Sequence, residues 1–152
     1  MLLRWYLIFA VALLLSICLF PAPLMGMEPV WLVLVLLYAF WYEPKIVPWW
    51  LLAVWGLLMD VLFSSPFGEH VLALMLIYGL ARLPSRPFSR LLVPQQMALV
   101  GACVSSYLIV LALMLRLQGY PIIWTEIVMK TLMSTLFWPW ISLVFRKKRV
   151  LQ

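Results

Sequence analysis

The sequence predicts an all-α membrane protein, a bundle of six transmembrane helices in a single domain over residues 1–152. Composition is the first reason. The chain is 67% hydrophobic and only 11% charged, whereas a soluble domain is typically about half apolar and a quarter charged. The second reason is arrangement, because the apolar residues form six runs separated by short polar or Pro- and Gly-bearing stretches. Each crossing takes roughly 20 residues, so these runs leave no room for a separate soluble domain.

The first and the shortest runs need separate justification. In chain order the expected spans are approximately 5–20, 28–42, 46–63, 66–81, 97–115 and 122–145. The first follows Arg4 and resembles a signal peptide, but Pro23 fits poorly into a small-residue cleavage motif. We therefore interpret it as an uncleaved span. The second and fourth are short, and by length alone either could re-enter the membrane instead of crossing it.

The distribution of basic residues favours a crossing by all six segments. Cytoplasmic loops collect Lys and Arg. With the N-terminus inside, nine of the eleven basic residues fall on the cytoplasmic side, Arg116 falls outside, and Lys130 lies within the last span. Both termini are therefore expected in the cytoplasm. The net charge of +6 is explained by topology and by attraction to anionic membrane lipid, and nucleic-acid binding is not expected.

Ionisable residues inside the expected spans are costly and are therefore functional candidates. Asp60 lies near the outer end of the third span, and Glu126 and Lys130 lie in the outer half of the sixth. Glu126 precedes Lys130 by four residues, which places both on one helix face, and Asp60 reaches a depth at which it could pair with Lys130. Neutralisation among these groups and binding of a partner or ligand both remain open. An ion relay is disfavoured because no chain of acids crosses the membrane.

Small and helix-breaking residues are the remaining candidates. Gly56 lies one turn before Asp60 and lets another helix approach closely, and Pro66 and Gly68 lie in a break that returns the chain. Pro139 interrupts the sixth span and predicts a kink. Each of these features is more often packing than chemistry. Tryptophans near span ends are interpreted mainly as interface anchors, namely Trp49, Trp50, Trp124, Trp138 and Trp140.

The sequence contains no recognisable enzyme motif. The one histidine, His70, follows Glu69 in what is interpreted as an ordinary short outer loop, and this pair forms neither a metal site nor a catalytic triad. Cys18 and Cys103 lie in apolar runs without metal or redox spacing, and they are expected to pack as small hydrophobes. Neither an enzymatic activity nor a cofactor is expected.

Three stretches of the chain resemble the MreD family of rod-shape-determining membrane proteins. They are Val30–Tyr38, Gly56–Gly68 continuing through Val71–Leu74, and Leu136–Trp140 ahead of the basic tail. The middle stretch matches the family's Gly-x-x-x-Asp pattern, which is followed by a Gly after a short break. Family members often carry an Asn shortly before the Trp-Pro stretch, where this chain has Ser134-Thr135. The likeness covers nearly the whole chain.

The resemblance implies a fold, a location and partners. The fold would be a helical bundle like the substrate-binding S-component subunits of energy-coupling-factor vitamin transporters, in the bacterial inner membrane. The function would be that of a non-enzymatic scaffold that binds MreC directly and supports lateral peptidoglycan synthesis by the elongation machinery. The wider complex would hold MreB, RodA and a transpeptidase penicillin-binding protein.

The alternative function is that of a small-molecule or lipid-binding, transporter-like membrane subunit. A sizeable cavity with several convergent polar groups would favour such a binder. A bundle filled by side chains, with an exposed apolar groove, would favour the scaffold.

Overall fold

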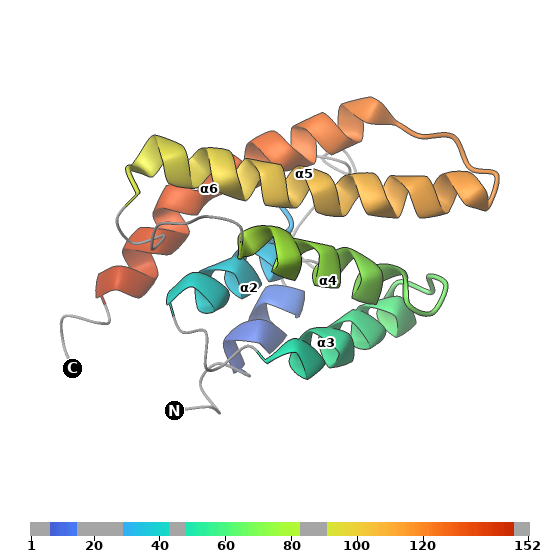
Figure 1. The fold of residues 1–152 in the computed structure, drawn as a ribbon, viewed down its shortest axis with the longest axis horizontal. Helices are drawn as coiled ribbons and strands as arrows, with labels where there is room; N and C mark the ends of the chain where they lie inside the picture. Colours follow the sequence, from blue (N-terminus) through green and yellow to red (C-terminus); the bar gives the residue numbers. More distant parts are fainter. Residues whose placement is uncertain (1–6, 15–28, 43–47, 83–90, 148–152) are drawn as a thin grey trace.

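The computed structural model describes residues 7–14, 29–42, 48–82 and 91–147, which form helices and their connections without a strand. Residues 7–14 belong to an N-terminal helix. The later helices each overlap one predicted span (Figure 1), and they are α2 (Trp31–Tyr42), α3 (Trp49–Leu62), α4 (Glu69–Ala81), α5 (Val93–Leu117) and α6 (Trp124–Lys147). Cys18, Arg86, Arg90 and the basic residues after 147 lie outside the described residues.

Helix length separates α5 from the other described helices. Among the described helices, α5 is the one that is long and apolar enough, by length and composition, to cross a membrane. The apolar helices α2, α3 and α4 have 12, 14 and 13 residues, below the range of about 17–25 for a typical span. α6 has 24 residues, but its first two turns carry Glu126 and Lys130.

The core of the bundle is built around α2. All residues of α2 from Leu32 to Ala39 are buried, and α4, α5 and α6 pack against this helix. A helix that is hydrophobic on every side is expected where protein covers all of its faces. Phe9 of the N-terminal helix is also fully buried, and its ring centroid lies 5.6 Å from that of Trp55 on α3.

Trp138 faces this core, so its interpretation as an interface anchor is wrong. Its side chain is fully buried, its Nε1 donates to Oε1 of Gln96 at 3.4 Å, and its ring packs edge-on against Trp41. Trp140 is 71% exposed. Successive helical residues are about 100° apart, so residues two positions apart point in nearly opposite directions.

The helices α3 and α4 approach each other closely at Gly56. A Cβ atom at Gly56 would lie 2.7 Å from the Cα and N atoms of Val71, which is far inside van der Waals contact. Glycine therefore permits this packing of the two backbones. The turn between α3 and α4 lies at the same end of the bundle as the connection between α5 and α6 (Figure 1).

Candidate functional site

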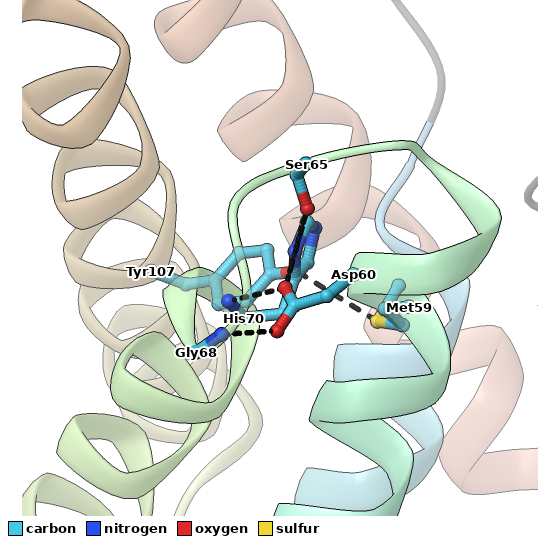
Figure 2. Close-up of polar contacts among 6 residues, drawn as sticks. All are labelled: Met59, Asp60, Ser65, Gly68, His70 and Tyr107. Carbon is cyan, nitrogen blue, oxygen red and sulfur yellow. Dashed lines mark hydrogen bonds and ion pairs between the residues drawn. The ribbon is translucent and has the colours of Figure 1, made fainter. Parts of the chain in front are cut away.

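The carboxylate of Asp60 lies at the centre of the α3–α4 turn. Asp60 is 1% exposed, and its two oxygens accept hydrogen bonds from the backbone N–H groups of Gly68 at 2.6 Å and of His70 at 3.0 Å. These N–H groups belong to the first turn of α4, where intrahelical partners are missing. Asp60 therefore caps α4 from the preceding helix (Figure 2). Gly68 has φ +96°, a conformation that glycine adopts without steric penalty.

The side chains of His70 and Ser65 complete the network around Asp60. Nδ1 of His70 lies 2.8 Å from Oδ1 of Asp60, and because an ionised carboxylate only accepts, Nδ1 is the donor. The hydroxyl of Ser65 donates to the same Oδ1 at 3.2 Å and lies 3.2 Å from Nδ1. In a hydrolase triad the serine and the acid contact opposite nitrogens of the histidine. The shared nitrogen makes this cluster a structural network and not a nucleophile with its base.

One interpretation of the sequence is wrong at this site, and one possibility that it left open is not realised. Glu69 and His70 are not an ordinary loop, because they begin α4 and are 6% and 7% exposed. The partners of the Asp60 carboxylate are Ser65, Gly68 and His70, and they do not include Lys130. The capping N–H groups are eight and ten residues away in the chain, so the α3–α4 turn itself brings them to Asp60.

A cavity of about 470 Å³ opens beside this network. Met59, Ser65, His70 and Tyr107, four of the residues that line it, surround Asp60 in Figure 2. Tyr107 comes from α5, is 2% exposed, and donates from its hydroxyl to Sδ of Met59 at 3.9 Å. The lining is mixed, since apolar side chains of α5 stand beside several hydroxyl, amide and charged groups.

Glu69 is the unusual residue of the cavity wall. It lines the cavity, yet its Oε2 is buried and makes no hydrogen bond within the described part of the chain. Buried polar groups in proteins are nearly always paired. A carboxylate also accepts and never donates, so only a donor can satisfy this atom.

The charged candidates on α6 lie apart from Asp60 but border the same region. Lys130 lines the cavity of about 470 Å³ and also a second cavity of about 190 Å³. Glu126 is exposed and lines only the second of these. Pro66 is exposed in the α3–α4 turn, and α6 continues through Pro139, whose carbonyl accepts from Ser142 at 2.8 Å.

Ser134 makes a polar contact shortly before the Trp-Pro stretch of α6. It is fully buried, and its Oγ accepts the backbone N–H of Val30 at 3.0 Å. Val30 immediately precedes α2, so this bond joins the start of α2 to α6 and satisfies one backbone donor there.

His70, Glu69 and Tyr107 are the site residues that the sequence interpretation missed. A local signal existed for the first two, because Gly68 followed by an acidic residue is compatible with a helix start, where acids are enriched. Tyr107 had no such signal. It reaches the site only because α5 packs on α4, as Figure 1 shows.

Among the described residues, no three His, Cys, Asp or Glu side chains gather closely enough to hold a metal ion. No solved structure matches this chain. The family described as rod shape-determining protein MreD has a model that matches residues 1–148. The match contains the Gly56–Gly68 stretch, whose Asp60 and Gly68 are joined by the capping hydrogen bond. By this match over nearly its whole length, the chain belongs to the MreD family, which acts in the determination of rod shape.

Proposed function

We propose that this protein is a non-enzymatic, six-span scaffold of the bacterial inner membrane that binds MreC and supports lateral peptidoglycan synthesis. MreB, RodA and a transpeptidase penicillin-binding protein would belong to the wider complex. The supporting observation is the capped α3–α4 turn, in which Phe67 is 82% exposed. Phe67 and the 81% exposed Leu117 border one surface pocket. Large apolar side chains exposed together are typical of protein-binding surfaces.

The orientation of this surface follows from the proposed topology. With both termini in the cytoplasm, the α3–α4 turn and the α5–α6 connection face the periplasm, where MreC has its soluble domain. The charge distribution supports this orientation. The short helices α2, α3 and α4 are accommodated because neighbouring helices and local bilayer thinning compensate for a short span.

The change Phe67→Ala tests the proposed MreC surface. We expect it to lower the recovery of MreC with the affinity-tagged chain about tenfold, because a buried aromatic anchor commonly contributes more than about 1–2 kcal/mol. Recovery is measured after solubilisation of membranes that contain both proteins. Since Phe67 is exposed, its replacement leaves thermal unfolding unchanged.

The matched control is Trp140→Ala. Trp140 is an aromatic residue with 71% exposure that lies near the proposed cytoplasmic end of α6. The Trp140→Ala variant should retain MreC at the wild-type level. If both variants recover MreC as well as the wild type, the outer-end surface is not the binding site.

The cavity of about 470 Å³ favours a second candidate function at the same end of the molecule. Its volume lies within the roughly 300–1,000 Å³ of small-molecule sites, and its apolar wall carries several convergent polar groups, as such sites do. Binding of an amphiphilic molecule, such as a lipid, is therefore proposed beside the scaffold role.

A further inference from the structure

The buried carboxylate of Glu69 provides chemistry that the capping network does not use. Glu69 is only 6% exposed, and its Oε2 has no hydrogen-bond partner in the part of the chain that the structure describes. Burial of an unpaired acceptor is costly, and an ionisable group within a membrane helix is a candidate functional group. A molecule in the adjoining cavity that donates to the Glu69 carboxylate would reduce this penalty.

The surroundings of Glu69 select a cationic donor. Glu69 is the first residue of α4, where the helix dipole favours a negative charge. Nδ1 of the neighbouring His70 is directed to Asp60. Ser64 and Gln118, which carry oxygen acceptors, line the same cavity, as does Lys130. A primary ammonium group has three donors and no acceptor, which matches a wall that carries a carboxylate and further oxygens.

The extension of the cavity indicates that the cation belongs to an amphiphile. The cavity shares Leu108, Leu111, Leu115 and Lys130 with the second cavity of about 190 Å³. This second cavity lies between α5 and α6 and adds mainly apolar residues, among them Ile122 and Ile127. A cavity of mixed lining that shares a wall with an apolar one fits a head group followed by an acyl chain, whereas a free amine would leave the apolar cavity without a function.

We propose that these two cavities bind a lipid with a primary ammonium head group, of the phosphatidylethanolamine type. The ammonium lies against Glu69 and an acyl chain follows the apolar cavity between α5 and α6. This inference rests on the second candidate function above, and the scaffold role does not depend on it.

Native mass spectrometry of the full-length chain in detergent tests the proposal. Phosphatidylethanolamine and phosphatidylglycerol with identical acyl chains are added in equal amounts, and the ratio of the bound lipids is measured. The wild type is expected to prefer phosphatidylethanolamine. Glu69→Gln, which keeps the size of the side chain, is expected to reduce this preference about tenfold or more, because the bond to a charged acceptor is lost.

Two further variants separate recognition of the head group from binding of the chain. Glu126→Gln removes an exposed carboxyl that lines only the second cavity, and it should keep the wild-type ratio. Leu111→Trp narrows both cavities and should reduce both lipids equally. Circular dichroism confirms that each variant retains its helices.

Each contrary outcome has a distinct meaning. If wild type and Glu69→Gln show the same preference, Glu69 does not recognise the ammonium and the proposal fails. If the wild type retains both lipids equally, amphiphile binding stands but ammonium recognition is wrong. If the wild type binds neither lipid above the level of non-specific binding, the second candidate function itself fails. Competition by free ethanolamine at the same concentration as the lipid would overturn the lipid assignment in favour of a small amine.

A photo-crosslinking residue at Leu115 decides between a lipid and a protein side chain as the donor. Leu115 lines both cavities. In membranes, an adduct with the mass of phosphatidylethanolamine supports the proposal. An adduct with a protein alone would overturn it, because a Lys or Arg of a partner would then occupy the site.

Discussion

At the scale of residues, Asp60 acts as the helix cap that α4 does not supply for itself. The N-cap residue Gly68 has no side chain, so the orphan N–H groups of α4 are satisfied by the carboxylate at the end of α3. A charged acceptor strengthens these bonds, and the positive end of the helix dipole attracts the same charge. One side chain therefore fixes the geometry of the turn and the position of the His70 ring.

The change Asp60→Ala is expected to lower the free energy of unfolding by about 3–5 kcal/mol, because each buried donor left unsatisfied costs about 1–3 kcal/mol. The backbone N–H groups of Gly68 and His70 and Nδ1 of His70 lose their acceptor. Ser65→Ala removes one neutral donor and is expected to cost only about 1 kcal/mol. Unfolding by heat or denaturant in detergent measures both variants, and equal losses would show that Asp60 does not serve as the cap.

The sequence was sufficient to select Asp60 and Gly68 but not to pair them correctly. An acid inside a span and a glycine in a break are visible as patterns, and both lie at the site. Helical depth alone left Lys130 open as a partner of Asp60, and the interpretation of Glu69 and His70 as a loop missed the start of α4. A cap between two helices depends on how the turn folds, which the period of the apolar residues does not encode.

At the scale of elements, α3 and α4 form a closely packed pair. Gly56 permits backbone contact near the middle of α3, and the Asp60 network closes the turn one helical turn further along. Two points of attachment fix both the separation and the rotation of the helices. Phe67 and Glu69 are thereby held on a rigid support, which both proposed binding activities require.

Gly56→Ala is expected to destabilise the protein by about 1–3 kcal/mol, as overpacking of a tight interface does. The added Cβ would lie 2.7 Å from backbone atoms of Val71, so the helices must separate. The melting temperature in detergent is the measurement.

Gly79→Ala is the matched control for this prediction. No atom lies within 4 Å of a Cβ at Gly79, and alanine favours a helix interior by about 1 kcal/mol over glycine. Its melting temperature should equal or exceed that of the wild type. A similar loss in both variants would contradict a role for close packing at Gly56.

At the scale of the whole molecule, the apolar runs of the sequence predicted the existence and order of the helices better than their lengths. Each described helix overlaps an expected span, but α2, α3 and α4 are shorter than the expected segments. The sequence also could not distinguish Trp138 from Trp140, because an apolar ring is compatible with a core, a lipid surface or an interface. Only the packing of α6 on its neighbours assigns Trp138 to the interior.

A topology reporter tests the proposed six crossings. A domain that is active only in the cytoplasm, fused after Gln152, should be active, because both termini are proposed to lie inside. The same domain inserted after Gly119, in the α5–α6 connection, should be inactive. A periplasmic result for the first fusion would reject the even number of crossings, and cytoplasmic activity at Gly119 would reject a crossing by α6.

The central position of α2 has a consequence for biosynthesis. Its 12 residues extend only about 18 Å at 1.5 Å per residue, and the helices that cover it, α4, α5 and α6, are all synthesised later. During translation α2 therefore leaves the ribosome before its permanent neighbours exist. The final environment of α2 is established only after α6 has been made. A nascent chain that stops before Ser134 also lacks the hydroxyl that accepts the backbone N–H of Val30 at the start of α2.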